Sequence, residues 1–449
     1  MKRLDLFPVT TKIVNQRLTI AGHDLASLAE EYQTPLYIYD RATLDAAASQ
    51  YKTALASFYP STGSGPTGSR PRPGLASVTY AGKAFLSLAL AQWTQLHGLT
   101  VDCTGEGEIA IAVAAGVPRE KILVHGVNKS EGDLKAAIQH AGIIVVDNLT
   151  ELNRIQLLIT NYQLPSLWLR YLPGVAVSTH HKYTQTGQHD SKFGMTREEI
   201  LEAAAYCKEY DLPLNGIHFH QGSNFRDPEP LLPAIESALE LSKEIGFSGE
   251  WHFCPGGGWS VAYHEDELPH PSIQSYVKGI AEAVVEGCQT HGLDIPHLHL
   301  EPGRSLVARA GVAIYRVGTI KKRVGKTWLL IDGGMADNPR YALYGARYAC
   351  LTVSDPGGER SEVVSIGGPY CESGDIIIED LPMPKVREGD LIAIPVSGAY
   401  HLSMSSNYNG ARKPAVLWLE EGKVQIIQRG EKTQDLLARD EELDSLRQL

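Results

Sequence analysis

The sequence predicts an α/β protein that combines a (β/α)8 barrel of the TIM type with a C-terminal antiparallel β domain. Three observations lead to this prediction. Eight short apolar runs alternate with Ala-, Leu- and Glu-rich stretches that are long enough for a helix. Reactive or turn-forming residues close these runs, as on the catalytic face of such barrels. After Arg304 the pattern changes to closely spaced β-type runs punctuated by Gly, Asp and Pro.

The eight barrel strands are expected in chain order, each with the length of a buried parallel strand. The first run ends in Lys83 and the eighth ends in Glu301. The runs cover residues 78–83, 100–103, 122–126, 143–147, 167–170, 216–220, 251–256 and 297–301. Because parallel barrel strands all end at the same mouth, the residues that close them should converge there. This convergence predicts an enzyme.

The remaining chain is organised around this barrel. Residues 1–40 contain strand-like pieces and are expected to pack with the β domain, while the barrel is expected over 41–305. The β domain is predicted over 306–430 and a charged tail over 431–449. The β-type runs that define the domain are 312–317, 327–331, 363–366, 391–396 and 415–419. A Ser/Gly/Pro-rich stretch at 61–74 is typical of an exposed loop.

Composition excludes several classes of protein. The 449 residues carry a net charge of −11 without a basic run, which argues against a nucleic-acid partner. The first residues lack the apolar segment of a secretory signal, and no run approaches the roughly 18 apolar residues of a membrane helix. The six cysteines are scattered without a Cys-x-x-Cys pair. We therefore expect a cytoplasmic protein with reduced thiols and no membrane partner.

Lys83 is the first candidate catalytic residue. A lysine at a barrel mouth can form a Schiff base when burial lowers its pKa, although a lone lysine is more often an ordinary surface residue. Gly256, Gly257 and Gly258 follow the seventh strand and can present backbone N–H groups to a phosphate, but a triple glycine is more often only a tight loop. Gly222 and Ser223 can add an N–H and a hydroxyl to the same anion.

Two further groups close the sixth and eighth strands. Glu301 and Arg304 can hold different ends of one ligand, and a structural ion pair is about as probable for this tetrapeptide alone. His218 and His220 alternate along the predicted sixth strand and should face the same side. Their spacing also suits a metal, which leaves a zinc hydrolase as a rival interpretation, with a buried structural histidine as the simpler one. In barrel metallohydrolases, however, such a pair opens the first strand, where this chain has Lys83.

Cys371 lies in a Gly- and Pro-rich turn of the predicted β domain, beside Glu372. Neighbouring carboxylates disfavour the thiolate, so this thiol suits proton donation better than nucleophilic attack. An unreactive loop cysteine is the usual alternative.

Taken together, these motifs resemble the fold-type III decarboxylases that use pyridoxal 5′-phosphate. The resemblance covers about residues 35 to 420, and its motifs occur in the family's order. They are Tyr80–Ala84, His125–Lys129, Thr186-Gly187 with Ser191–Gly194, His218–Ser223, Pro255–Gly258, Glu301–Arg304, Cys371–Asp375 and Met404–Asn409. The chain departs from the family pattern at Phe85, where Asn is usual, at Tyr341, where Pro is usual, in the motif Thr104–Glu108, and in the apparent insertion at 61–74.

The resemblance implies a role for each candidate. Lys83 would hold the cofactor, His220 would stack on its ring, and Glu301 would keep the ring nitrogen protonated, which favours decarboxylation over racemisation. Cys371 would deliver the proton that replaces the lost carboxylate. Asp102 and Glu108 would lie near the lysine amine. The implied phosphate-binding residues are Gly222, Ser223, Gly256, Gly257, Gly258 and Tyr400.

The implied substrate is meso-2,6-diaminopimelate, which would yield L-lysine and CO2. Arg304, Arg340, Tyr344 and Tyr400 would bind the substrate, with the arginines pairing its carboxylates, and Glu372 would meet the far amino group. A sister decarboxylase acting on ornithine, lysine or carboxynorspermidine is the alternative. A non-catalytic relative is a third possibility, which the joint presence of the catalytic candidates disfavours. The family further implies a homodimer in which the cysteine loop of one chain completes the other chain's site, and it implies no catalytic metal.

Overall fold

The computed structural model describes residues 2–60, 75–159, 164–174 and 190–443. The predicted loop at 61–74 and the Thr186-Gly187 motif lie outside these residues. The chain divides into two compact units. The barrel unit comprises Leu44–Val261 and Pro269–Val307, and the β unit comprises Met1–Thr43, Ala262–Leu268 and Ala308–Leu449.

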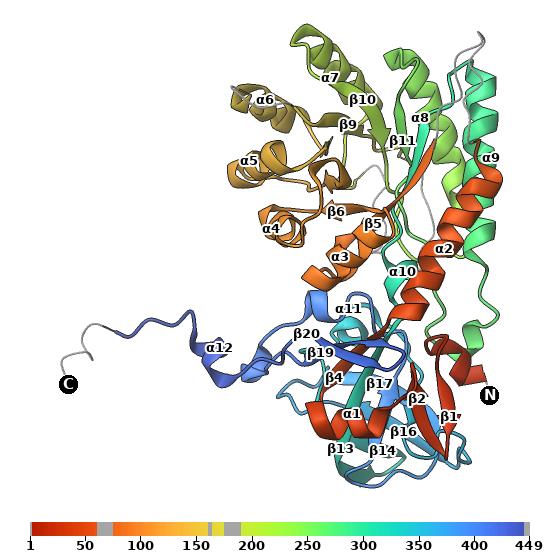
Figure 1. The fold of residues 1–449 in the computed structure, drawn as a ribbon, viewed down its shortest axis with the longest axis vertical. Coiled ribbons are helices and arrows are strands. Elements are labelled where there is room, and N and C mark those ends of the chain that lie inside the picture. Colours follow the sequence, from red (N-terminus) through yellow and green to blue (C-terminus); the bar gives the residue numbers. More distant parts are fainter. Residues whose placement is uncertain (1, 61–74, 160–163, 175–189, 444–449) are drawn as a thin grey trace. The chain divides into compact units, whose positions relative to one another are not determined.

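In the barrel unit, eight parallel strands form a closed barrel in the order β10-β11-β12-β5-β6-β7-β8-β9. The strands are β5 (Ala76–Ala81), β6 (Thr100–Cys103), β7 (Ile122–Val124), β8 (Ile143–Val146), β9 (Ser166–Arg170), β10 (Leu214–His218), β11 (His252–Cys254) and β12 (His297–Leu300). Figure 1 shows helices α3 to α9 arranged around these strands. The predicted barrel is confirmed, with all eight strands at the predicted places.

Helices follow the strands as the alternation predicts. They are α2 (Arg41–Phe58), α3 (Leu88–Leu96), α4 (Glu106–Ala114), α5 (Glu131–His140), α6 (Leu149–Leu158), α7 (Arg197–Glu209), α8 (Leu232–Ile245), α9 (Ile273–His291) and α10 (Arg304–Val307). Capping boxes begin two of them: Ser130 with Asp133 at α5, and Thr196 with Glu199 at α7. No helix of the described ranges is both long enough and apolar enough to span a membrane.

The β unit is built on a nine-stranded sheet with the path β17-β16-β14-β13-β4-β19-β20, to which β18 and β15 are added through β13. Its strands are β4 (Leu36–Asp40), β13 (Gly311–Arg323), β14 (Lys326–Ile331), β15 (Leu351–Thr352), β16 (Glu362–Gly367), β17 (Ile376–Met383), β18 (Leu391–Ile394), β19 (Ala415–Glu420) and β20 (Lys423–Gln428). The N-terminal strand β4 contributes to this sheet as expected. Two pairs, β14 with β16 and β4 with β19, are parallel, so the sheet is mixed and not antiparallel throughout.

Smaller elements complete the β unit. A three-stranded sheet joins β1 (Lys12–Val14), β2 (Arg17–Ile20) and β3 (His23–Asp24). The short helices are α1 (Leu25–Tyr32), α11 (Arg340–Tyr344) and α12 (Thr433–Leu437).

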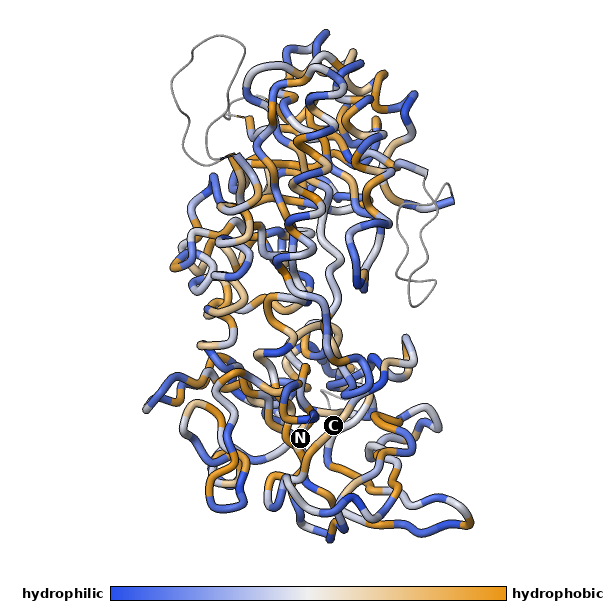
Figure 2. Tube along the Cα trace, turned by 90° about the vertical axis from the view of Figure 1, so that its right-hand side faces the viewer, coloured by the Kyte–Doolittle hydropathy of each residue, from blue (hydrophilic) through white to orange (hydrophobic). Residues whose placement is uncertain are grey.

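Each unit has its own apolar core, and Figure 2 shows hydrophobic stretches running through both units. In the barrel, Leu123, Val145, Trp168 and Cys254 form one buried cluster. These four residues come from β7, β8, β9 and β11, which are not all neighbours, so their side chains meet inside the barrel. The β unit buries a larger cluster that joins β4, β13 and β19 to the small N-terminal sheet and α1.

Candidate active site

The C-terminal ends of the barrel strands gather the predicted polar residues. Lys83 lies in the short 3-10 turn Gly82–Ala84 directly after β5, Asp102 lies near the end of β6, and Glu301 follows β12. Lys83 is exposed, whereas Asp102 and Glu301 are buried. β10 ends at His218, so His220 is a loop residue and not the strand residue that was predicted.

Glu301 is the centre of this group. His125 Nε2 lies 2.9 Å from Glu301 Oε1, and His218 Nε2 lies 3.1 Å from Glu301 Oε2. Both histidines are buried, and the carboxylate accepts a hydrogen bond on each of its oxygens. Burial alone would raise the pKa of Glu301, but the two histidines outweigh it and hold the pKa well below its usual value. Glu301 is therefore a fixed anion at neutral pH.

The histidines around this anion are neutral. Burial lowers the pKa of His218 to about 4, against the opposing effect of Glu301, and it also lowers the pKa of His125. Burial, helped by the charge of Lys83, lowers the pKa of His220 well below its usual value. A neutral imidazole in this loop presents an uncharged aromatic face, which suits stacking on a flat ring.

Two carboxyl groups lie within the electrostatic reach of Lys83. Burial, with a further contribution from Glu301, raises the pKa of Asp102 to about 7, and Lys83 opposes this rise. Burial also raises the pKa of Glu108, which Lys83 again opposes. Glu108 Oε2 accepts a hydrogen bond from the Thr104 N–H at 2.7 Å, which fixes it at the start of α4. The structure thus brings together the lysine and both acids that were predicted near it.

The triple glycine after β11 forms a close-fitting loop. A Cβ on Gly257 would lie 2.0 Å from the Glu301 carbonyl oxygen, and a Cβ on Gly256 would lie 2.6 Å from His220 Nδ1. Gly258 has φ +109° and would place a Cβ 2.4 Å from the Gly222 carbonyl oxygen. Only glycine therefore fits these positions, and the loop brings bare backbone against the ends of β10 and β12. Such a backbone cradle suits a phosphate, because N–H groups can approach it without side chains between them.

Ser223 and Arg304 lie beside this cradle and contact each other. Arg304 Nη2 donates to Ser223 Oγ at 3.1 Å. Arg304 begins α10 and is buried, while Ser223 is partly exposed. The contact places a cationic donor and a hydroxyl together at the loop that was predicted to bind an anion.

In the β unit, Arg340 is held by a buried network. Its Nη1 donates to the Tyr348 hydroxyl at 2.5 Å, and that hydroxyl lies 2.8 Å from His401 Nε2. His401 Nδ1 lies 3.3 Å from the Tyr37 hydroxyl, which donates to Asp337 Oδ2 at 3.0 Å. This chain of contacts fixes one edge of the guanidinium.

Aromatic rings complete the surroundings of Arg340. The ring of Tyr263 lies 4.5 Å from the guanidinium carbon, within the range of a cation–π contact. Tyr344 ends α11 and Tyr400 has φ +61°, and both are partly exposed. Tyr341 bonds to the carboxylate of Glu379 and not to its neighbour Arg340. The tyrosine at position 341 therefore does not compete with Tyr348 for the Arg340 guanidinium.

Cys371 and Glu372 lie on an exposed turn between β16 and β17. The Cys371 N–H donates to Asn409 Oδ1 at 2.9 Å, which ties the turn to the Met404–Asn409 motif. Asp375 accepts from the Met335 N–H at 2.7 Å and the Tyr370 N–H at 2.8 Å. The backbone of the turn is therefore anchored, while the thiol and the Glu372 carboxylate face outward.

Several residues of these networks were not predicted in the roles that the structure gives them. His125 and His218 belong to predicted motifs but were not identified as the partners of Glu301. Arg170 at the end of β9 lies 4.5 Å from the Phe193 ring and influences the pKa of Asp102. Their position at strand ends was a usable signal. Tyr348 and His401 gave no such signal, because their contact with Arg340 joins distant parts of the sequence.

Comparison with known proteins extends this picture. The family model of the pyridoxal-dependent decarboxylases, pyridoxal binding domain, matches residues 72–308. A diaminopimelate decarboxylase of Bacillus subtilis is 39% identical over 438 residues, which cover 94% of this chain and 95% of that protein. The chain belongs to the diaminopimelate decarboxylase family. The crystal structure of a family member from M. jannaschii has a TM-score of 0.85 at 30% identity and covers 97% of this chain and 99% of its own.

Membership in the diaminopimelate decarboxylase family makes the chain a pyridoxal-phosphate-dependent decarboxylase, and its residues fit that cofactor. The glycine cradle would be filled by any Cβ, Glu301 is a buried anion, and Lys83 has the required amine at the same mouth. His125, His218 and Glu301 could also group around a metal, since their ligand atoms lie within 4.8 Å of one another. The predicted metal pair of the rival interpretation, His218 with His220, is not the pair found in that group.

Proposed function

We propose that this chain decarboxylates meso-2,6-diaminopimelate to L-lysine and CO2 with pyridoxal 5′-phosphate as its cofactor. Support comes from the named relatives and from the M. jannaschii diaminopimelate decarboxylase in co-complex with L-lysine, which has a TM-score of 0.85 at 29% identity. The observation in this chain that carries the proposal is the Glu301 carboxylate, held as an anion by two neutral histidines.

When bound, pyridoxal phosphate supplies an electron sink for the electron pair that remains when the substrate carboxylate leaves as CO2. Glu301 would pair with the ring nitrogen and keep it protonated, and Lys83 would hold the cofactor through its amine. His220 would stack on the ring with its neutral imidazole. Gly222, Ser223, Gly256, Gly257, Gly258 and Tyr400 would hold the phosphate.

Asp102 and Glu108 serve the lysine amine in this proposal. Asp102 has a pKa of about 7, so it can hold or release a proton near Lys83 at neutral pH. Glu108 is fixed by its bond to the Thr104 N–H and stays near the same amine. The two acids would thereby hold or move a proton at the amine of Lys83.

The substrate proposal depends on two cationic groups and one acid. Arg340 presents a preorganised guanidinium, fixed by Tyr348, that can pair with the distal carboxylate together with the Tyr344 hydroxyl. Arg304 would supply a second guanidinium for this same carboxylate. Glu372 is exposed and binds the distal amino group. Ornithine and lysine lack the second carboxylate, so such a set of groups favours diaminopimelate.

The proton donor is Cys371 in this proposal, and the functional unit is a homodimer. Cys371 and Glu372 are exposed on a turn whose backbone is anchored through Asp375 and Asn409. A thiol and a carboxylate presented in this way are available to the active site of a second copy of the chain. We therefore propose that each of the two active sites is completed by the partner's turn.

The deciding experiment incubates purified, cofactor-loaded protein with meso-diaminopimelate and quantifies CO2 and L-lysine. Equal amounts of both products are expected, with no CO2 from L-ornithine or L-lysine under the same conditions. Lys83→Ala is expected to lose both the activity and the visible absorbance of the lysine-bound cofactor. Absence of both products from protein that retains this absorbance would overturn the substrate assignment, and full activity of Lys83→Ala would overturn the mechanism.

A further inference from the structure

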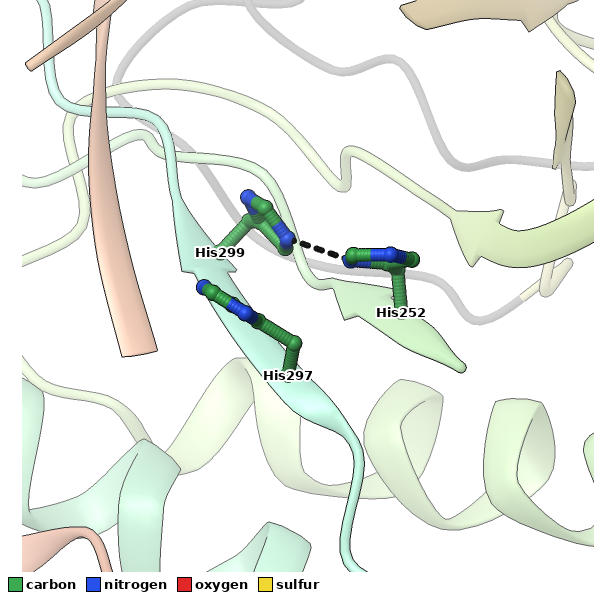
Figure 3. A group of neighbouring side chains, drawn as sticks. All are labelled: His252, His297 and His299. Atoms are coloured by element: carbon green, nitrogen blue, oxygen red, sulfur yellow. Dashed lines mark hydrogen bonds between the residues drawn. The ribbon is translucent and has the colours of Figure 1, made fainter. Parts of the chain in front are cut away.

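Three histidines lie together at the N-terminal end of the barrel, opposite the mouth that holds Lys83 and Glu301. His252 and His297 are the first residues of β11 and β12 and are register partners, and His299 lies two residues further along β12. One ring nitrogen of each lies within 4.8 Å of those of the other two. Figure 3 shows the three rings converging from the two strands.

The side chains face the barrel interior. His252 lies two residues before Cys254, which belongs to the inner cluster, so both residues are on the same side of β11. The ring of Trp168, from the same cluster, lies 5.3 Å from the His252 ring and 4.6 Å from the His299 ring. His299 is buried, while His252 and His297 are partly exposed toward the N-terminal end. The group is thus enclosed by the barrel and open at one end.

Hydrogen bonds orient two of the three rings. His299 Nε2 lies 2.9 Å from His252 Nδ1, and His299 Nδ1 lies 2.8 Å from Ser77 Oγ on the neighbouring strand β5. A hydroxyl on the second nitrogen is the kind of partner that fixes the orientation of a metal-binding histidine. Nε2 of His297 is buried and has no hydrogen-bond partner among the residues that the structure describes. This ring nitrogen of His297 is therefore a buried polar atom without a protein partner among the described residues.

Imidazoles bind a metal in their neutral form, through the lone pair of a ring nitrogen. The positive charge of Lys121 acts on His297 and His299 and reduces the affinity of the group for a cation.

We propose that His252, His297 and His299 bind one transition-metal ion of the zinc class at the N-terminal end of the barrel, with water as the fourth ligand. Zinc binds imidazole nitrogen at about 2.0–2.1 Å, which places tetrahedral ligand atoms about 3.3 Å apart. The 2.9 Å contact between His252 and His299 then widens by a few tenths of an ångström as the metal replaces the shared proton. A set of three imidazoles without a carboxylate suits zinc, cobalt, nickel or copper and does not suit magnesium or calcium.

The role of this ion is structural. It links β11 to β12 at the end of the barrel away from the proposed chemistry. The described part of the chain places the second cluster with metal-ligand geometry, His125, His218 and Glu301, at the cofactor mouth. Loading the protein with pyridoxal phosphate before the titration occupies the cofactor mouth. Metal binding at the three histidines can then be measured apart from binding at His125, His218 and Glu301.

The test is a Co²⁺ titration of the full-length, tag-free, cofactor-loaded protein after treatment with a chelator. A Cys371→Ser background removes the exposed thiol as a competing ligand. We expect one Co²⁺ per chain, with the intense visible absorption of a tetrahedral site, and displacement of Co²⁺ by Zn²⁺. His297→Gln should weaken binding at least about tenfold, because a ligand is lost. Zn²⁺ should also raise the thermal unfolding temperature of the parent protein and leave that of His297→Gln unchanged.

His291→Gln is the matched control, since His291 is a partly exposed histidine of the same unit that pairs with Glu236 on the helical surface. It should bind Co²⁺ as the parent does. The proposal is overturned if the parent shows no tetrahedral spectrum at one equivalent, or if His297→Gln and His252→Gln both bind Co²⁺ like the parent. These measurements do not depend on decarboxylation, so they are independent of the proposed substrate.

Discussion

At the scale of single residues, Asp102 gives the barrel a defined response to pH. Its folded-state pKa of about 7 lies well above the usual aspartate pKa of about 3.9, so the folded protein holds this proton where the unfolded chain has released it. Stability therefore falls as the pH rises from about 4 to about 7, since the buried carboxylate must then become charged. Each pKa unit corresponds to ~1.4 kcal/mol, so the contribution is on the order of a few kcal/mol.

A prediction for Asp102→Asn follows from this fall in stability with rising pH. In cofactor-free protein, the variant should gain stability relative to the parent as the pH rises from 5 to 8, because asparagine does not titrate. Urea unfolding at both pH values measures the difference. A constant difference between the two proteins across this range would show that Asp102 is already ionised at pH 5.

Arg340 offers a second prediction at this scale. Removing the hydroxyl that fixes its guanidinium, in Tyr348→Phe, should raise the KM for meso-diaminopimelate about tenfold, which corresponds to ~1.4 kcal/mol. The kcat should change less than about twofold, because in the proposed site Tyr348 only positions Arg340 for binding of the distal carboxylate. Steady-state kinetics separate these two constants.

Tyr341→Phe is the control for this variant. Tyr341 is adjacent to Arg340, but its hydroxyl bonds to Glu379, so the KM should stay near that of the parent. An equal rise of KM in both variants would mean that a general loosening of α11, and not the Tyr348 contact, is responsible.

The positions of single residues are predictable from the sequence where the barrel topology determines them. Lys83 and Glu301 close barrel strands, and a parallel barrel brings all such ends to one mouth. His220 was misplaced on the strand because the apolar pattern continues through Phe219, whereas the pairing of β10 stops at His218. The contacts of Tyr348, His401 and Tyr37 were not predictable, since they join residues up to hundreds of positions apart and no local pattern records them.

At the scale of elements, the loop after β7 depends on a buried ion pair. Lys129 Nζ donates to Glu151 at 2.7 Å and to the carbonyl oxygens of Val145 at 2.8 Å and Gly126 at 3.0 Å. The lysine side chain is fully buried. It thereby joins the loop that carries His125 to β8 and α6, and its place in the His125–Lys129 motif is explained by this structural role.

Breaking this pair should be costly. Lys129→Met leaves the buried Glu151 carboxylate without its partner, and a loss of about 3–5 kcal/mol in the free energy of unfolding is expected. The matched double variant Lys129→Met with Glu151→Leu removes both charges and should recover most of the loss. Denaturant unfolding of the three proteins tests this, and a double variant as unstable as the single one would contradict it.

The strands themselves show what local pattern can and cannot predict. All eight barrel strands are recognisable because each is a short run rich in apolar residues between helical stretches. β17 and β20 were missed. The apolar run that begins β17 covers only Ile376–Ile378 before two acidic residues follow, and β20 is exposed or half-buried along its whole length. The parallel pairing of β4 with β19 also could not be predicted, because it joins the two ends of the chain.

At the scale of the whole molecule, the proposed sharing of sites between two chains makes a direct prediction. Lys83→Ala and Cys371→Ala should each be nearly inactive, yet co-expression of the two variants should restore activity at up to about a quarter of the sites. If each site takes its lysine from one chain and its cysteine from the partner, a mixed dimer has one site that carries both substitutions. Its second site then has both native residues. The assay is decarboxylation by the co-purified mixture, compared with each variant alone. Failure to restore activity in verified mixed dimers would place both residues in the same chain's site.

The central place of β4 in its sheet has a consequence for biosynthesis. β4 leaves the ribosome early, yet its sheet partners are β13 and β19, and β19 begins only at Ala415. The nascent chain must therefore carry an open strand edge through most of translation, and such edges invite association with other chains. A premature stop codon between Ala308 and Ala415 leaves one side of β4 permanently bare. We expect such truncated products to aggregate and be degraded, even though every residue of the barrel unit has been made.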